Sequence, residues 1–185
     1  MPRKRNIYSK EIPPNLTIKS FTLNQLKLYT EGWPDHAFDK PVEVIPNVWL
    51  SGIGFNDNVP KWCKDNNFTH IINAAGSYVT TCNYKTNPIS LNINYMELEI
   101  EDRSTVNLSR FFKSIKLFFQ HAQDSNGKLL IHCIWGQSRS VSCLIYYLMS
   151  SQNISYDEAL YLIRKVRPVA LPNFGFEAQL RNIKT

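Results

Sequence analysis

A strand, a short loop and a helix follow one another between residues 128 and 151, and this order restricts the fold more than any other part of the chain. Residues 128–132 are an apolar run that predicts a buried strand. Apolar side chains recur at helical spacing through residues 138–151. Strands that alternate with amphipathic helices pack as α/β layers. We therefore expect an α/β domain in which the strand ending at His132 lies near the centre of the sheet.

The other segments fit the same architecture. Apolar residues recur at spacings of three and four from Leu108 to Ala122, which predicts the clearest helix, with Asn107 as its N-cap. Ser155 and Glu158 form a capping-box pattern at the start of another helix, and Asn173 is expected to cap the last one. Strands are further expected at 42–45, 48–51, 69–73 and 93–100, and a short helix at 59–65. The predicted fold is a central, mainly parallel sheet flanked by helices.

The net charge of +6 first suggests a polyanionic partner such as nucleic acid. Its distribution argues against that. Residues 1–10 hold four basic side chains and no acidic one, which leaves 17 basic and 15 acidic residues over 11–185. The positive charge therefore belongs mostly to one end of the chain, and a nucleic-acid partner is not favoured.

Residues 1–41 are expected to form a basic N-terminal arm, and residues 42–185 a single folded domain. Prolines interrupt the arm, and only Thr22 to Tyr29 has helical periodicity. Such an arm could pack on the domain or join two copies as a homodimer. No run reaches the roughly 18 apolar residues of a membrane span, and no secretory signal is evident. We expect a cytoplasmic or nuclear protein that does not enter the membrane.

The loop between the predicted strand and helix has the composition of an anion-binding site. Successive backbone N–H groups there can point inward, and the following helix directs its positive dipole end to the same spot. Cys133 begins this loop, Gly136 permits a tight bend, and Arg139 closes it. A thiol in that field should favour the thiolate below its free pKa of about 8.5, and Arg139 can hold two phosphoryl oxygens. The loop thus predicts a nucleophilic cysteine at a phosphate site.

The four cysteines differ in what they can do. Because there is no CxxC pair and no histidine at metal-ligand spacing, neither a disulfide framework nor a metal site is predicted. A lone cysteine is most often a small core residue, and we assign that role to Cys63 and Cys143. Cys143 lies too far along its helix for a direct bond to Cys133. The role of Cys82 stays open.

Three motifs in the expected order resemble a known family. The segment from His132 to Ser140, with Cys-x5-Arg-Ser, resembles the signature of the cysteine-dependent protein tyrosine phosphatases, and its Ser-Arg-Ser ending is most similar to the dual-specificity branch. Residues 102–108 look like the general-acid loop of that family. Residues 172–180 are similar to the closing segment of mitogen-activated protein kinase phosphatases. The resemblance covers residues 42–183 and implies that residues 42–185 are a dual-specificity phosphatase catalytic domain.

The resemblance implies a mechanism and a role for each site residue. Cys133 would attack phosphorus, Arg139 would stabilise the equatorial oxygens, and Asp102 would protonate the leaving oxygen and then activate water. Ser140 would donate to the Cys133 sulfur. His132 and Asn173 would support the site. The loop that binds phosphate would comprise Cys133, Ile134, Trp135, Gly136, Gln137, Ser138 and Arg139. No metal or cofactor is implied, because the loop supplies the positive field.

Some assignments keep an alternative. Glu99 and Glu101 lie close to Asp102, which is preferred for its spacing to Leu108 and its short side chain. His132 could orient the loop and support the thiolate, or have a purely structural role. Ile134 and Trp135 are expected to ring the pocket mouth, where Trp135 could stack on a substrate or serve as a partner contact.

Three other functions compete with a phosphatase that acts on phosphorylated proteins. Phosphoinositide phosphatases with this chemistry commonly carry extra Lys or Arg inside the loop, and RNA 5′-triphosphatases have an Asn-Arg-Thr ending; neither occurs here. A catalytically silent phosphoprotein-binding module usually lacks the cysteine, the arginine or the acid, and all three are present. With no obvious long insertion to deepen the pocket, we predict hydrolysis of phosphotyrosine and of phosphoserine or phosphothreonine.

Overall fold

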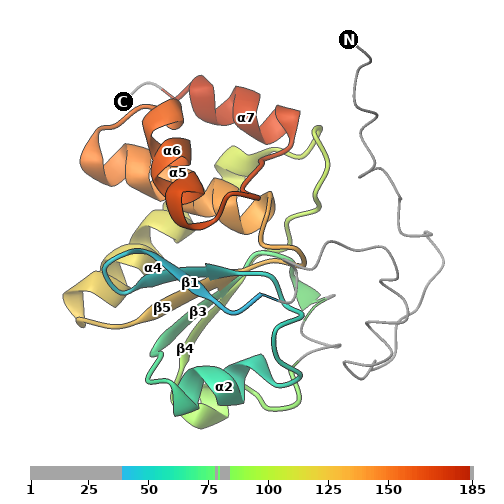
Figure 1. Ribbon diagram of the computed structural model, residues 1–185, viewed down its shortest axis with the longest axis vertical. Helices are drawn as coiled ribbons and strands as arrows, with labels where there is room; N and C mark the ends of the chain where they lie inside the picture. The colour runs from blue at the N-terminus through green and yellow to red at the C-terminus, as the bar shows by residue number, and fades with distance from the viewer. Residues whose placement is uncertain (1–38, 78, 80–83, 184–185) are drawn as a thin grey trace, which may run out of the picture.

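Five strands form one sheet with helices on both of its faces (Figure 1). The computed structural model describes residues 39–77, 79 and 84–183. The strands are β1 (Val42–Ile45), β2 (Val48–Ser51), β3 (His70–Asn73), β4 (Asn94–Glu97) and β5 (Leu129–His132). The helices are α2 (Val59–Asp65), α4 (Phe112–Asp124), α5 (Arg139–Gln152), α6 (Tyr156–Val166) and α7 (Phe174–Arg181), with 3-10 turns η2 (Ile89–Leu91) and η3 (Leu108–Phe111).

The sheet is mainly parallel, as the sequence predicted. Its strand order is β1-β2-β5-β3-β4; β2, β5, β3 and β4 run parallel, and β1 pairs antiparallel with β2. The predicted central position of the strand that ends at His132 is confirmed. All four residues of β5 are buried, because helices cover both faces of this strand. The start of α5 therefore lies over the middle of the sheet.

A row of polar residues crosses the carboxyl ends of the parallel strands. Ser51, His132, Asn73 and Glu97 are register partners along β2, β5, β3 and β4. Register partners in a parallel sheet point to the same face, so these side chains gather beneath the loop that leaves β5. Ser51, His132 and Asn73 are fully buried. The fold thus places polar groups directly behind Cys133.

The predicted helix caps are confirmed. Asn173 accepts hydrogen bonds from the N–H groups of Gly175 and Phe176, and Ser155 and Glu158 make both bonds of a capping box. Asn107 caps the N–H of Ser109, but the predicted helix opens with the turn η3 before α4 begins. A side chain from α7, Gln179, accepts the Leu108 N–H, so the tighter turn is stabilised by a tertiary contact.

Two predicted elements differ from the structure. The strand expected at 93–100 is shorter, because β4 ends at Glu97 and the Ile100 N–H then turns back to the Leu98 carbonyl. The helix predicted from Thr22 to Tyr29 lies outside the described residues, as does Cys82. Among the residues that the structure describes, no helix is both long and apolar enough to span a bilayer.

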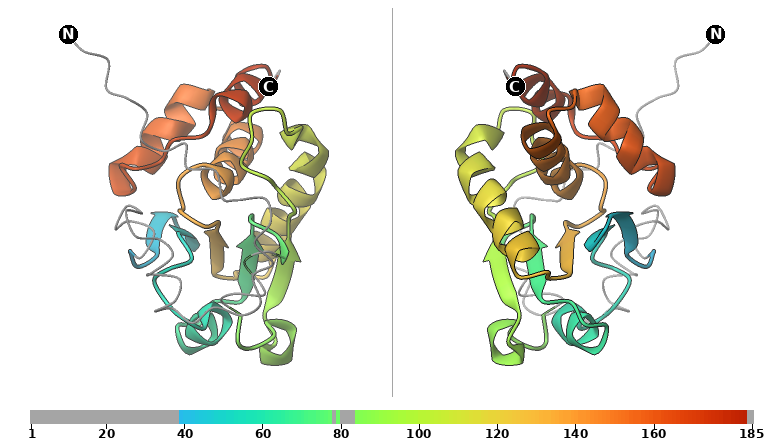
Figure 2. Two further views of the ribbon diagram at one scale, coloured as in Figure 1. Left: turned by 90° about the vertical axis from the view of Figure 1, so that its right-hand side faces the viewer. Right: turned by 90° about the vertical axis from the view of Figure 1, so that its left-hand side faces the viewer.

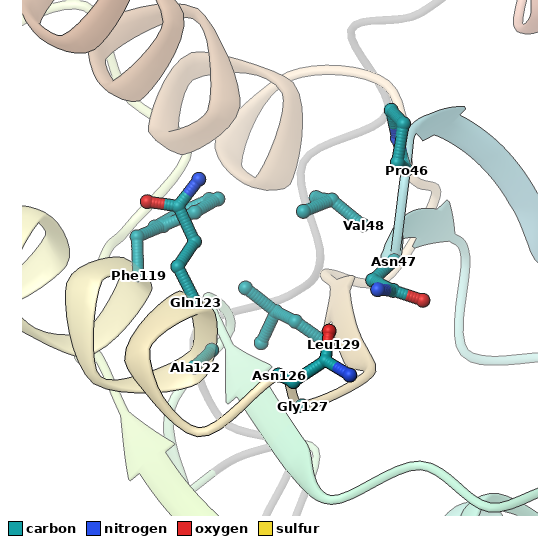
Figure 3. Close-up of a pocket in the computed structure, with 9 residues that line it drawn as sticks. All are labelled: Pro46, Asn47, Val48, Phe119, Ala122, Gln123, Asn126, Gly127 and Leu129. Carbon is teal, nitrogen blue, oxygen red and sulfur yellow. The ribbon is translucent and has the colours of Figure 1, made fainter.

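A hollow of about 170 Å³ opens at the amino end of β5 (Figure 3). Its floor includes Val48, Phe119 and Leu129, and the amide side chains of Gln123 and Asn126 lie at its edge. Because Leu129 begins β5 and Cys133 follows its end, the hollow lies at the opposite end of this strand from the loop of residues 133–138.

Two buried histidines make folding sensitive to mild acid. Burial, with a smaller contribution from His121, lowers the pKa of His70 to about 4, and burial lowers the pKa of His132 to about 3. The His70 ring is held between Thr69 Oγ1 and His121 Nδ1, each at 2.8 Å. The unfolded chain takes up protons near pH 6.5, where the folded chain keeps both rings neutral.

We predict that the free energy of unfolding falls as pH decreases from 6.5 to 5, above the usual range of carboxylate titration. Stability from a lowered histidine pKa is complete above the unfolded value and is lost as pH falls toward the folded one. Urea unfolding at several pH values measures the slope. His70→Asn should reduce that slope by roughly half, since one of the two shifted histidines is removed. An unchanged slope in this variant would contradict the assignment.

Candidate active site

The loop between β5 and α5 wraps around the Cys133 sulfur. The Gly136 N–H and the Ser140 hydroxyl donate to Sγ at 3.2 Å and 3.3 Å. Gly136 has a φ of +63°, and a Cβ there would lie 2.5 Å from the Gly52 nitrogen and from the Arg167 guanidinium. Only glycine fits that backbone and that space. The tight bend anticipated from the sequence is therefore present, and it aims an amide at the sulfur.

The environment of Cys133 favours the thiolate. Burial by itself raises the pKa of this thiol, since only 1% of the residue is exposed. The nearby Arg139 charge and the hydrogen bonds from the Ser140 side chain and backbone outweigh burial, although Asp102 opposes them, so the Cys133 pKa lies below its ordinary value. Cys63 and Cys143 show the contrast, because burial raises the pKa of both. Both lie in the hydrophobic core, as predicted.

Arg139 begins α5 and turns its guanidinium back under the loop. The residue is 6% exposed, and Nη1 donates to the Ile100 carbonyl at 3.4 Å. Nε lies 3.5 Å from an Asp102 oxygen and has no hydrogen-bond partner among the described residues. A buried guanidinium with an unused donor beside inward-pointing amides is suited to bind a phosphoryl oxygen.

Of the three neighbouring acids, only Asp102 is held by the loop. Its Oδ1 accepts from the Ser138 hydroxyl at 2.6 Å and from the Asn173 side-chain amide at 2.8 Å. Glu101 instead pairs with the exposed Arg103, and Glu99 accepts the Ser77 N–H. The side chain of Asp102 is 32% exposed, so it borders both solvent and the loop around Cys133.

Asn173 links α7 to the two loops. Its backbone N–H donates to the Ser138 hydroxyl at 3.0 Å, while its side chain caps α7 and binds Asp102. Gly175 lies two residues after Asn173, in the first turn of α7. If it carried a Cβ, that atom would lie 1.9 Å from the Ser104 carbonyl oxygen, so α7 approaches the segment after Asp102 very closely. Figure 2 shows α7 beside this segment. The carboxylate is thereby held from two separate elements.

His132 is buried and neutral beneath the loop. Its Nε2 lies 2.6 Å from the Tyr84 hydroxyl, and Tyr95 continues the network by donating to Glu97. Because burial lowers the His132 pKa to about 3, this ring carries no charge that could support the thiolate directly. The geometry favours the structural and orienting alternatives for His132.

Two residues that hold the site were not identified from the sequence. Arg167 is 3% exposed; its Nε donates to the Gly136 carbonyl at 2.6 Å and its Nη2 to the Trp135 carbonyl at 3.2 Å. These bonds hold the loop carbonyls on the outside while the amides face the sulfur. The second is Tyr84. An arginine at a helix end and a tyrosine in a polar segment carry no spacing signal toward the loop, so only the tertiary contacts show them.

One prediction for the loop is wrong. Ile134 was expected at the pocket mouth, but it is 6% exposed and lies in the hydrophobic core, where its carbonyl accepts the Ile53 N–H. The apolar side chain gains more from burial than from a place at the rim. Trp135, the next residue, is half-buried. Further along the loop, the Gln137 carbonyl accepts a hydrogen bond from the Leu171 N–H.

The described residues offer no group of three His, Cys, Asp or Glu side chains arranged as metal ligands. What the site does combine is a nucleophilic sulfur, a cationic fork and a carboxylate at the same place. Such a set can form and then hydrolyse a covalent phosphoryl intermediate.

Residues 54–185 match the family described as dual specificity phosphatase, catalytic domain. The Arabidopsis thaliana protein named dual specificity protein phosphatase 1B is 32% identical over 142 residues, which are 77% of this chain and 80% of that protein. Mouse dual specificity protein phosphatase 2 is 26% identical over 96% of this chain, but this match covers only 51% of the mouse protein.

Solved structures of proteins with similar names have the same fold as this chain. The crystal structure of DUSP15 superposes with a TM-score of 0.64 at 27% identity, covering 76% of this chain and 85% of that one. The human tyrosine phosphatase-like serine/threonine/tyrosine-interacting protein superposes with a TM-score of 0.66 at 28% identity, covering 76% and 92%. The chain belongs to the dual specificity phosphatase family of the protein tyrosine phosphatase superfamily. It is a cysteine-dependent hydrolase, a dual-specificity protein phosphatase.

We predict that alkylation of Cys133 by iodoacetamide has a pH midpoint below about 8.5. Arg139→Met should raise the midpoint, because the removed charge lowers the Cys133 pKa, and Ser140→Ala should raise it less. Mass spectrometry of the labelled peptide distinguishes Cys133 from the other thiols. Arg110→Met, which removes an exposed charge on η3, is the matched control. Equal midpoints in the wild type and both site variants would contradict the electrostatic argument.

We also predict that Arg167→Ala lowers the free energy of unfolding by about 2–3 kcal/mol, since two buried carbonyls lose a charged donor. Arg167→Lys should unfold less easily than the alanine variant yet still bind inorganic phosphate more weakly than wild type, because an ammonium cannot reach both carbonyls as the fork does. Urea unfolding and competitive inhibition by phosphate measure the two effects. Lys165→Ala, at an exposed position near the end of α6, two residues before Arg167, should change neither.

Proposed function

We propose that Cys133 is the nucleophile of a two-step phosphomonoester hydrolysis. Its sulfur attacks phosphorus, a sulfur–phosphorus bond forms, and the bond from phosphorus to the ester oxygen breaks. Asp102 gives its proton to the departing oxygen, while Arg139 and the loop amides bind the remaining phosphoryl oxygens. The observation that carries the proposal is the position of the Asp102 carboxylate, 3.5 Å from Arg139 and bonded to Ser138 of the same loop that surrounds Cys133.

The second step returns the enzyme to its starting state. Asp102, now ionised, takes a proton from water as the water oxygen attacks phosphorus. The sulfur–phosphorus bond breaks and the thiolate leaves, aided by the hydroxyl of Ser140, which donates to Sγ at 3.3 Å. Inorganic phosphate is the product, and the thiolate is again stabilised by Arg139.

We infer that the substrates are proteins phosphorylated on tyrosine and on serine or threonine. Among the loop residues only Arg139 is cationic, so the site offers one positive fork for a single phosphoryl group rather than several for a polyphosphorylated headgroup. The 5′-triphosphate end of RNA would likewise carry more charge than this loop can pair. The names of the plant and mouse relatives agree with protein substrates.

The main alternative to an active phosphatase is a catalytically silent module that only binds phosphoproteins. One structural relative is named as an interacting protein. Catalysis is favoured because Cys133 is present and accepts the Ser140 hydroxyl at 3.3 Å, and because Arg139 lies 3.5 Å from Asp102 in the same site. A thiolate nucleophile works only when it is reduced, and thiols stay reduced in the cytoplasm and nucleus, which supports a cytoplasmic or nuclear location.

Pairing of two copies through residues 1–41 stays a prediction. The mass in solution with and without residues 1–40 tests it.

Asp102→Asn should lower kcat about 10²- to 10⁴-fold on phosphoserine peptides, because their alkoxide leaving group needs a proton. The loss should be much smaller on p-nitrophenyl phosphate, whose leaving group departs without help. Glu101→Gln is the matched control, since this neighbouring acid faces Arg103 instead, and it should retain wild-type rates. Steady-state kinetics on both substrates, with Cys133→Ser as the inactive reference, measure the difference. An equal loss on both substrates would contradict the role of Asp102 as general acid.

A further inference from the structure

Two large apolar side chains stand in solvent beside the active site. Phe174 is 77% exposed and Leu171 is 51% exposed. They flank Pro172 and Asn173, the residue whose side chain binds Asp102. Leaving aromatic and aliphatic surface of this size in water costs free energy that burial against an apolar partner would recover. The pair is called the apolar rim below.

The apolar rim is fixed to the catalytic loop by its backbone. The Leu171 N–H donates to the Gln137 carbonyl at 2.8 Å, and the Asn173 N–H donates to the Ser138 hydroxyl at 3.0 Å. Phe174 is the first residue of α7, which packs closely on the segment after Asp102. The two side chains are therefore presented from a rigid backbone rather than from a free loop. Figure 2 shows how the start of α7 and the segment between β4 and η3 lie on the same side as the loop after β5.

The other exposed apolar side chains among the described residues lie on η2, α4 and α6. They are Ile89, Leu117, Tyr161 and Val166. Scattered apolar residues of this kind are normal on protein surfaces. Among the residues that the structure describes, only the apolar rim combines two such side chains with direct backbone bonds to the phosphate-binding loop. A substrate whose phosphoryl group reaches Cys133 brings its neighbouring residues close to the loop to which the rim is bonded.

Most hydrogen-bonding capacity of the Asn173 side chain, which lies between the two rim residues, is already taken within the protein. The Asn173 side-chain amide donates to Asp102, and its oxygen accepts the N–H groups of Gly175 and Phe176. A polar substrate residue would therefore find at most one N–H of the Asn173 side chain left to bind, whereas an apolar one would cover exposed surface. Consecutive Cα atoms are about 3.8 Å apart, so the rim can meet residues one or two positions from the phosphorylated residue.

We propose that Leu171 and Phe174 form a specificity surface that selects phosphoproteins with a large apolar residue within two positions of the phosphorylated residue. The proposal rests on the proposed function, since it describes the substrate of the same site. The rim acts on binding of the flanking residues and makes no contact with the reacting atoms. It should therefore act on KM for peptides more than on kcat.

The test uses the full chain and phosphotyrosine peptides that differ at one position. Leucine or serine is placed in turn at each of the two positions before and after phosphotyrosine, and kcat/KM is measured for every pair. Wild type should prefer leucine about fivefold or more at one position at least. Phe174→Ala and Leu171→Ala should each reduce that ratio about threefold or more through KM, and Phe174→Leu should restore part of it. Leu117→Ala, which removes an equally exposed side chain from α4, should keep the wild-type ratio.

The outcomes separate this proposal from the proposed function. Equal hydrolysis of leucine and serine peptides by wild type, with p-nitrophenyl phosphate hydrolysed, overturns the apolar rim alone. A ratio that is unchanged in both alanine variants, or a loss of the same size on p-nitrophenyl phosphate, overturns it as well, because the side chains would then serve no flanking residue. Absence of any hydrolysis by the well-folded wild type contradicts the proposed function, and the rim proposal falls with it.

Discussion

One negative charge, held where almost no water reaches it, dictates the arrangement of this active site. Burial opposes the thiolate of Cys133, so the protein must supply compensating groups within a few ångströms. It does so with the charge of Arg139, the hydroxyl of Ser140 and the amide of Gly136. Each of these groups comes from the loop or from the first turn of α5, because a strand, a tight bend and a helix start bring them to one point.

Hydrogen bonds from several distant parts of the chain hold that loop in place. Arg167 binds its outer carbonyls, and Asn173 and Ser138 hold Asp102 beside Arg139. Beneath the loop, the polar row at the carboxyl ends of the strands surrounds the neutral ring of His132. The same contacts that position the carboxylate also fix the backbone of residues 171–174. Binding of the phosphoryl group and presentation of the rim side chains thus follow from one set of hydrogen bonds.

Much of the local structure could be predicted because its causes are local. The caps at Ser155 and Asn173, the central strand and the loop with its glycine all follow from neighbouring residues, and the structure confirms them. The errors have equally clear causes. The sequence placed Ile134 at the pocket mouth because the pattern of a loop does not show which side chain turns inward. The predicted strand at 93–100 was too long because the alternation of apolar and polar residues continues past the end of β4, through the turn that leads to Asp102.

The amino-acid order alone was enough to predict Cys133 as the nucleophile and Arg139 as the phosphate-binding residue, because both lie in one short segment whose local geometry favours those roles. Its resemblance to a known family gave the class of protein, which the comparisons confirm. The sequence already favoured Asp102 over Glu99 and Glu101. The contacts that hold its carboxylate, the roles of Arg167 and Tyr84, and the neutrality of His132 required the folded chain. Those features arise from contacts between segments far apart in sequence, such as the 71-residue separation of Asp102 and Asn173. Burial and distance have no counterpart in a linear pattern.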